Sequence, residues 1–306
     1  PEPEQEGGGA TLTEVQGAGK ERKVTETVPM VLDWMAGSQS LGRAVGKDMM
    51  YIGYDVQQDV FAGTERRWVK NEVLDLAVTS PQALLTDVKR VVRKRLGKPA
   101  GSKVRVRVVL LGMSPCCKTF SKADSSNTKK GHNYRIHKGK VGKNRPPKDN
   151  WSEKGKAAHR ADHMVQQGIR VAEWFAQEQG TKFYMENPVG SLRKRPYMQQ
   201  WVKSKRVVQR EVDYCAYSHY YMKTTNIWTN MSKWRQEGQT GTGKCEGRCS
   251  AGCTGGTGRW EHIYKLSQGS WQSVQGRGRK AKKNMMPLLL QEELLAQALK
   301  ETELME

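Results

Sequence analysis

Short apolar runs alternate along the chain with stretches of helical spacing. Runs rich in Val, Ile, Leu and aromatic residues lie at 27–33, 49–56, 103–115, 181–188, 206–218 and 225–231, and each fits one β-strand. A helical pattern begins at Leu41, and a second fills 159–180 with apolar residues at helical spacing, Met164, Ile169, Val171, Ala172 and Phe175. Strands that alternate with helices predict an α/β fold with a mostly parallel sheet. Ligands of such sheets lie at the carboxyl ends of the strands, so chemistry is expected there.

The ends of the first two strands form a nucleotide-type pattern. The first run ends at Asp33 and is followed by small residues that allow a tight turn, while the second ends near Asp55. In nucleotide sites the first turn lets the backbone approach the cofactor, and an acidic residue at the second strand binds ribose hydroxyls. The same combination also arises by chance in α/β proteins, so both interpretations stay open at this point.

The charge of the chain points to a polyanionic partner. Its 306 residues include 52 Lys and Arg against 31 Asp and Glu, a net charge of +21 with a pI near 9.8. The charge is clustered, which favours nucleic acid over a solubilising or ribosomal surface. No apolar stretch approaches the ~20 residues of a membrane span and no signal-peptide pattern opens the chain. These features predict an intracellular protein without a membrane partner.

The N-terminal segment and the cysteines complete the composition. Residues 1–26 are rich in Gly and Glu and are predicted to be a disordered lead-in. The start at Pro1 indicates a part of a larger chain or polyprotein. The six cysteines are irregularly spaced, which predicts reduced thiols or metal ligands instead of a disulfide framework.

Two motifs at strand ends carry a resemblance to a known family. "SPCC" (114–117) is followed by Phe120-Ser121, and Glu186 of "MENP" (185–188) lies 69 residues after Cys117. With "LDWMAG", "GYD", "IWTN" and the late "MMPLLLQEELL", they resemble the motif series of the C5-cytosine methyltransferases. The segment "GSLRKRPYM" after "MENP" is similar to the phage-type and retroelement-associated branch. The resemblance implies a Rossmann-like methyltransferase sheet that uses S-adenosylmethionine.

The resemblance also assigns catalytic roles. Counting back from Phe120-Ser121 makes Cys117 the nucleophile that adds to cytosine C6; an alignment on "SPC" alone selects Cys116, and two packed structural thiols are the third possibility. Glu186 would protonate the ring at N3, Asn187 would shape the turn, and Lys223 would contact the target base or phosphate.

The same motifs name the cofactor contacts. The implied S-adenosylmethionine-binding residues follow the strand ends: Asp33, Met35, Ala36, Gly37, Asp55, Val56, Asp75 and Pro115. Gly37 keeps the first turn possible, but Ser38 and Gln39 replace the rest of the glycine pattern. Asp75 could equally be a helix or turn cap.

Basic segments follow the nucleophile and acid motifs. Residues 118–156 are dense in Lys and Arg and broken by Gly and Pro, so they resemble the loop that closes over a flipped base or, alternatively, a basic linker. The predicted nucleic-acid contacts are Lys118, Ser121, Lys122, Lys129, Lys130, Arg135, Arg193 and Arg195.

A glycine-rich segment contains three cysteines at four-residue steps. Cys245, Cys249, Cys253 and His262 could hold a structural Zn²⁺, although the spacing is not that of a standard finger and a plain loop is the alternative. The predicted organisation is therefore a catalytic domain at 27–230, a small glycine- and cysteine-rich insertion for target recognition at 231–283, and a C-terminal helix at 284–306 that returns to the catalytic domain.

Together these features predict a DNA cytosine-5 methyltransferase. It would act on a cytosine flipped out of double-stranded DNA, in the nucleus if the source is eukaryotic. Two alternatives remain: a transfer-RNA-type cytosine-5 methyltransferase, and a catalytically silent nucleic-acid-binding relative. The protein partners and the recognition sequence are not predicted.

Overall fold

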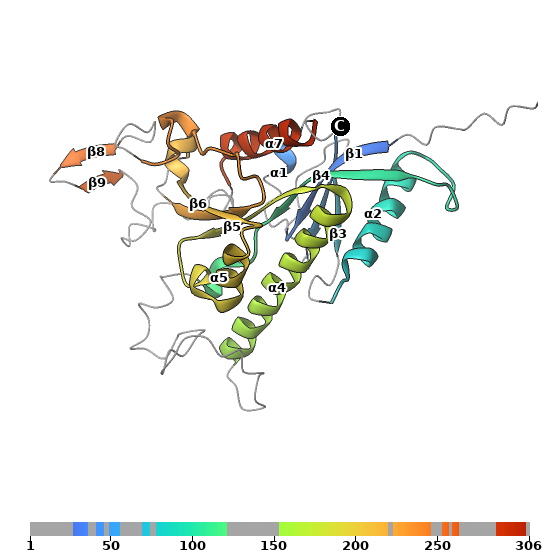
Figure 1. Cartoon of the computed structure of the whole chain (residues 1–306), viewed down its shortest axis with the longest axis horizontal. Coiled ribbons are helices and arrows are strands. Elements are labelled where there is room, and N and C mark those ends of the chain that lie inside the picture. The colour runs from blue at the N-terminus through green and yellow to red at the C-terminus, as the bar shows by residue number, and fades with distance from the viewer. Residues whose placement is uncertain are drawn as a thin grey trace, which may run out of the picture.

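A computed structural model describes residues 27–35, 41–45, 49–55, 69–73, 78–120, 153–219, 223–245, 253–256, 259–262 and 286–303. Its main feature is a seven-stranded sheet with the order β3-β2-β1-β4-β5-β7-β6 (Figure 1). The strands are β1 (Thr27–Trp34), β2 (Met50–Asp55), β3 (Val69–Val73), β4 (Arg105–Met113), β5 (Lys182–Pro188), β6 (Val208–Asp213) and β7 (Thr224–Thr229). Strands β1 to β5 pair in parallel, while β7 is antiparallel to both β5 and β6. The predicted α/β, mostly parallel, Rossmann-like sheet is confirmed.

Helices cover both faces of this sheet (Figure 1). On one face lie α2 (Pro81–Arg95), the long α4 (Glu153–Gln179) and α5 (Pro196–Lys203); on the other lie α1 (Leu41–Ala44) and α7 (Leu288–Glu303). Strand β1 serves both layers, since Leu32 and Trp34 pack with the α2 and α4 side and Val31 packs with the α7 side. Near-continuous apolar strands are what burial on both faces requires.

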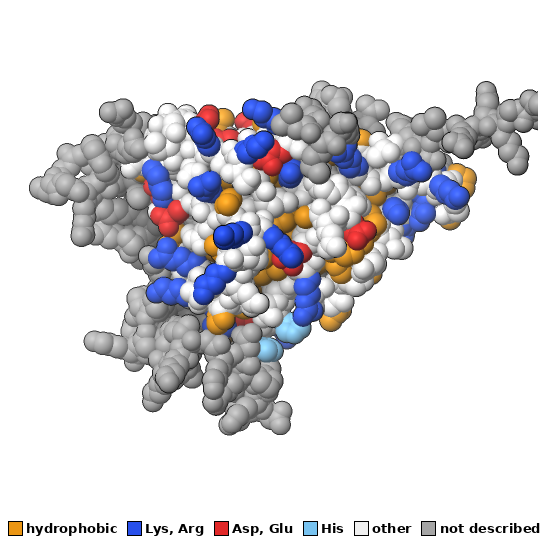
Figure 2. All heavy atoms as spheres, in the orientation of Figure 1, with side chains coloured by type: hydrophobic (Ala, Val, Ile, Leu, Met, Phe, Trp, Pro, Cys, Tyr) orange, Lys and Arg blue, Asp and Glu red, His pale blue; other side chains and the backbone are white. Residues whose placement is uncertain are grey.

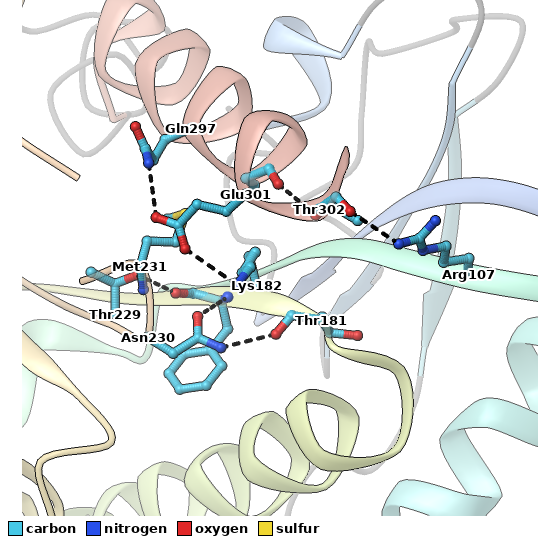
Figure 3. Close-up of polar contacts among 11 residues, drawn as sticks. Arg107, Thr181, Lys182, Thr229, Asn230, Met231, Gln297, Glu301 and Thr302 are labelled. Atoms are coloured by element: carbon cyan, nitrogen blue, oxygen red, sulfur yellow. Dashed lines mark hydrogen bonds and ion pairs between the residues drawn. The ribbon is translucent and has the colours of Figure 1, made fainter. Parts of the chain in front are cut away.

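Polar contacts anchor α7 at two places. Near its C-terminal end, Glu301 forms an ion pair with Lys182 of β5 (3.2 Å), and Arg107 donates to the Thr302 carbonyl at 3.4 Å (Figure 3). Nearer its start, Glu293 accepts hydrogen bonds from the Trp234 indole (2.8 Å) and the Gly238 backbone (3.0 Å). Helix α7 is therefore part of the main domain, held by buried apolar side chains and by these contacts.

Several elements differ from the prediction. The strand predicted at 206–218 ends at Asp213, and a 3-10 turn, η5 (Tyr214–Tyr217), follows it. Strand β3 and helices α2 and α5 were not predicted, and α4 begins at Glu153 instead of 159. Helix α1 has only four residues.

The first residues after β7 pack against the core of the main domain. Met231 and Trp234 are buried against α7, and the backbone N–H of Cys245 donates to Asp213 of β6 at 3.0 Å. Residues 231–245, which include the short turn η6 (Gly238–Thr240), thus pack on the sheet, although the sequence placed them in the insertion. Further along, β8 (Cys253–Gly256) and β9 (Arg259–His262) form a two-stranded antiparallel sheet. In the part of the chain described here, no helix is long and apolar enough to span a bilayer.

Candidate active site

The sheet topology brings four segments to one edge. Parallel strands β4 and β5 end side by side, so "SPCC" and "MENP" meet there, as parallel pairing requires. Because β7 is antiparallel to β5, its start, preceded by Lys223, lies at the same edge. Strand β6 runs opposite to β7 and therefore ends there as well, which places Tyr214 beside the other three.

Glu186 is the centre of this arrangement. Its side chain is 9% exposed, and its Oε1 atom accepts a hydrogen bond from the Tyr214 hydroxyl at 2.6 Å. The Lys223 ammonium lies 3.4 Å from the same oxygen and 4.6 Å from the centre of the Tyr214 ring. A cation over the face of an aromatic ring is held by the ring quadrupole. Tyr214 thus fixes both the carboxylate and the lysine that faces it.

The loop that carries the cysteines is attached to the loop that carries Glu186. The Asn187 amide donates to the Pro115 carbonyl at 3.0 Å, and Ser191 donates to the Phe120 carbonyl from its backbone N–H (2.8 Å) and hydroxyl (3.2 Å). A Cβ at Gly190 would lie 2.1 Å from the Phe120 oxygen, so only glycine allows this approach. These contacts hold the relative position of Cys117 and Glu186.

The two cysteines have different environments. Cys116 is exposed, whereas Cys117 is partly buried and begins the 3-10 turn η2 (Cys117–Thr119). Burial raises the pKa of the Cys117 thiol above its ordinary value; the Lys223 charge opposes this rise and the Glu186 charge adds to it. The charges of Lys223 and Glu186 therefore both act on the Cys117 thiol, and its role as nucleophile stays a prediction.

The cofactor residues predicted on the first strands fall into two groups. Asp33 is buried and accepts a hydrogen bond from the Tyr51 hydroxyl at 2.8 Å, so its carboxyl group lies inside the protein. Burial raises its pKa to about 7, against the lowering effect of the Tyr51 hydrogen bond, and the nearby Asp55 charge adds to the rise. Met35, also buried, takes a left-handed conformation (φ 64°), which turns the chain sharply at the end of β1.

Four of the eight predicted S-adenosylmethionine contacts lie among the described residues: Asp33, Met35, Asp55 and Pro115. Asp55 is partly exposed at the end of β2, where a carboxylate can accept from ribose hydroxyls, and Pro115 is buried. The carboxyl group of Asp33 is already used by Tyr51. Ala36, Gly37, Val56 and Asp75 lie outside the described residues. The donor set that is described fits a ribose at Asp55, and the remainder stays a prediction.

The predicted nucleic-acid contacts are mostly outside the described residues. These are Ser121, Lys122, Lys129, Lys130 and Arg135, together with the side chain of Lys118. Arg193 lies 3.6 Å from Glu211, with both side chains 37% exposed. Arg195 forms a buried ion pair with Asp162 (2.6 Å), which also accepts from the Tyr197 hydroxyl. Arg195 therefore holds α5 to α4, a structural role that the sequence did not indicate.

The zinc prediction is not supported by the described residues. Among them, no group of three or more His, Cys, Asp or Glu side chains could hold a metal ion. Cys249 lies outside the described part, as do the side chains of Cys253 and His262, whose backbones are partners in the β8–β9 pair. Cys245 is described, and its backbone contacts Asp213. Zinc remains a prediction.

Tyr214 is the site residue that the sequence analysis missed. It was counted within a strand that continued to residue 218, whereas β6 ends at Asp213 and the 3-10 turn points the Tyr214 hydroxyl at Glu186. A tyrosine next to a strand end is too common a pattern to mark such a contact in advance.

Comparisons with known proteins add little to this geometry. No protein-family model matches the chain, and no curated protein sequence matches it. Among solved structures, the fold is similar to the crystal structure of the S. pombe Dnmt2 methyltransferase, with a TM-score of 0.37 and 8% sequence identity, over 67% of this chain and 49% of that one. The chain thus spans about half the length of that protein. Because this similarity is low, an assignment of function has to be argued from the side chains of the site.

Proposed function

We propose that this protein is an S-adenosylmethionine-dependent DNA cytosine-5 methyltransferase, with Cys117 as the nucleophile and Glu186 as the acid. One observation carries the proposal. A partly buried thiol and a buried carboxyl group, far apart in sequence, are held at the same strand edge by loop contacts, and the Lys223 charge acts on both. A thiol nucleophile beside a proton donor is the pair of groups that addition to a cytosine ring requires.

The reaction can be written with these residues. The Cys117 thiolate adds to C6 of a flipped-out cytosine, while Glu186 gives a proton to N3, so the electron pair of the C5–C6 double bond becomes available at C5. The methyl group comes from S-adenosylmethionine, which leaves as S-adenosylhomocysteine. A base then removes the C5 proton, and that electron pair restores the double bond as the sulfur–C6 bond breaks toward Cys117. Glu186 regains its proton from N3.

The contacts of Glu186 assign its two oxygens. Tyr214 and Lys223 both bind Oε1, so we assign Oε2 to the substrate. Lys223 keeps a positive charge beside the thiol and thereby favours the thiolate against the effect of burial. Asp55 would hold the ribose of the methyl donor at the end of β2.

Covalent trapping on modified DNA tests the proposal. A duplex with 5-fluorocytosine at its cytosine positions cannot lose the C5 substituent, so a working nucleophile stays attached to the DNA when S-adenosylmethionine is present. We expect a denaturation-resistant protein–DNA adduct that disappears in Cys117→Ser and persists in Cys116→Ser, the matched control one residue away. Glu186→Gln should still bind DNA but react at least ~10²-fold more slowly, because a positioned proton donor contributes about that much.

The substrate and the residue assignment are tested in the same experiment. Parallel reactions with single-stranded DNA and with transfer RNA, each followed by tritiated methyl incorporation, show which nucleic acid is used. Incorporation only into RNA would replace DNA as the substrate. An adduct that is lost in Cys116→Ser but kept in Cys117→Ser would move the nucleophile by one residue, and no adduct or incorporation on any substrate would remove the proposed activity.

A further inference from the structure

The second half of α2 and the loop after it hold a concentration of positive charge that the proposed site does not use. Between residues 88 and 107, nine residues are Lys or Arg and none is Asp or Glu. Figure 2 shows Lys and Arg side chains gathered at the end of the molecule where α2 meets the loop to β4. Six of these residues define the α2 basic surface: Lys89, Arg90, Arg93, Lys94, Lys98 and Lys103.

The fold turns this charge outward. One side of α2 is buried in the core through Leu84, Val88, Val91 and Val92, so the basic residues between them occupy the outer side of the helix. Arg90, Lys94 and Lys103 are exposed, and the other three are partly exposed. The helix holds four of these cations, Lys89, Arg90, Arg93 and Lys94, on a rigid backbone, so little chain ordering is needed for them to meet a partner.

Helix stability alone does not explain the pattern. Cations in the last turn interact favourably with the helix dipole, which accounts for Arg93 and Lys94. However, Lys89 faces Arg93 and Arg90 faces Lys94 at four-residue spacing, an arrangement that repels. Asp87 offsets part of this repulsion through its 2.7 Å ion pair with Arg90. Lys98 lies at the end of the helix, where its backbone N–H donates to the Arg93 carbonyl at 3.0 Å, but Lys103 lies further along the loop and is not explained by the dipole.

The surface is separate from the candidate active site. Helix α2 ends at the edge of the sheet where β4 begins, and the cysteine loop follows the other end of β4 (Figure 1). The nine residues of β4 and the short segments that flank it span about 30 Å at the rise of a β-strand. These cations therefore cannot contact a base held beside Cys117, but they can contact a nucleic acid backbone elsewhere along its length.

We propose that the α2 basic surface binds the phosphate backbone of duplex DNA, as a contact region distinct from the edge that holds Cys117. Dense cations on a rigid helix are the footprint of such binding, and phosphate contacts give affinity and salt dependence without sequence reading. A lipid surface would need several apolar side chains as an anchor. Among the described residues of this half of the helix and its cap, one large apolar side chain is exposed, Leu96 at 36%, so the surface fits phosphates better than lipid. The inference concerns binding and stands whether or not the protein transfers a methyl group.

Salt-dependent DNA binding tests this surface. The probe is a fluorescent 30-base-pair duplex of A·T pairs only, which contains no cytosine and so does not depend on the active site. The test variant changes Lys89, Arg93, Lys94 and Lys98 to Gln; the control variant makes the same charge change at four exposed positions elsewhere, Arg160, Arg170, Lys233 and Lys300. Anisotropy titrations from 50 to 300 mM KCl give the slope of log Kobs against log[salt].

We expect the slope of the test variant to be smaller by about 2 to 3, since each lost phosphate contact removes about 0.9 from it. Its affinity at 100 mM salt should fall about 10-fold or more, while the control variant changes much less. The melting temperature should change little, because the test variant removes repulsion between like charges but also removes the favourable dipole interaction of Arg93 and Lys94.

Three results would overturn the proposal: equal losses in both variants, no loss in the test variant, or a loss confined to binding of phosphatidylserine vesicles. The proposed activity is judged separately by trapping on 5-fluorocytosine duplexes. If the wild-type protein is trapped as expected but the test variant keeps the wild-type salt slope, only the proposal for the α2 basic surface is wrong. Absent trapping in the wild-type protein, with the expected slope difference, removes the methyltransferase proposal and leaves this surface standing.

Discussion

Two carboxyl groups are buried at the same edge of the sheet, and their neighbours differ. Glu186 at the end of β5 accepts a hydrogen bond from Tyr214 and faces the Lys223 ammonium at 3.4 Å. Asp33 at the end of β1 accepts from Tyr51, and the charge that acts on it comes from another carboxylate, Asp55. Burial disfavours ionisation unless a cation compensates for lost water. The comparison shows that a cation faces the Glu186 side chain, whereas the Asp33 side chain is held by Tyr51 and lies near a second acidic group.

The largest expected effect is the loss of stability when a glycine near Glu186, or one near Asp33, is changed to alanine. At Gly190, beside Glu186, a Cβ would lie 2.1 Å from the backbone oxygen of Phe120. At Gly112, the sheet neighbour of Asp33, it would meet the ends of the Leu41 and Tyr184 side chains at 2.6 and 2.8 Å. Side-chain ends can move and a docked backbone cannot, so Gly190→Ala should cost about 3 kcal/mol and Gly112→Ala about 1 kcal/mol. Urea unfolding measures both, and equal costs would show that the Phe120 loop can shift.

The next effect is the pH dependence of stability due to Asp33. Its pKa is about 7 in the folded protein and near the model-compound value of 3.8 when unfolded, so the stability from its protonated form is present at low pH and lost as pH rises through 7. Between pH 5 and pH 8 this loss amounts to about 2 to 3 kcal/mol. Asp33→Asn keeps an acceptor for Tyr51 but cannot ionise, and we expect it to remove most of this loss in urea unfolding at the two pH values. An unchanged difference would assign the pH dependence to other groups.

The smallest expected effect is the change in kcat when Tyr214, or Tyr51 for comparison, is changed to phenylalanine. Tyr214→Phe removes the hydroxyl that holds Glu186 but keeps the ring that Lys223 contacts, so kcat for methyl transfer should fall about 10-fold while KM for DNA is unchanged. Tyr51→Phe removes the hydroxyl that binds Asp33, which should lower stability and leave kcat within about twofold. Steady-state kinetics on folded protein separate the two, and similar kcat values for both variants would deny Tyr214 a positioning role.

The sequence was sufficient for the features that repeat along the chain. Alternating strands and helices predicted the sheet, and parallel strand ends predicted that "SPCC" and "MENP" would meet, because such ends share one edge. Helix α2 was also predictable, since Ser80 caps it, Pro81 opens it and four apolar residues follow at helical spacing. Basic residues lie between these apolar positions and lower the overall hydrophobicity of the segment.

Side-chain partners across the fold could not be predicted in the same way. Tyr214 reaches Glu186 only because β6 ends at Asp213, and strand ends are the least certain feature of a sequence pattern. The buried pair of Arg195 and Asp162 depends on how α5 packs against α4, which no local pattern encodes. Likewise Asp33 had the expected position for a cofactor contact, but Tyr51 on the next strand binds its carboxyl group.

Helix α7 has a consequence for how the protein is made. Val31, Leu110 and Ile227 from three strands share a buried apolar cluster with Leu290, Leu294 and Ala298, so this part of the sheet lacks its cover until α7 has been made. A nascent chain that has released its strands from the ribosome, but not yet α7, therefore exposes apolar side chains there. Such a surface favours aggregation and chaperone binding. Once α7 has been made, its apolar side chains bury this part of the sheet.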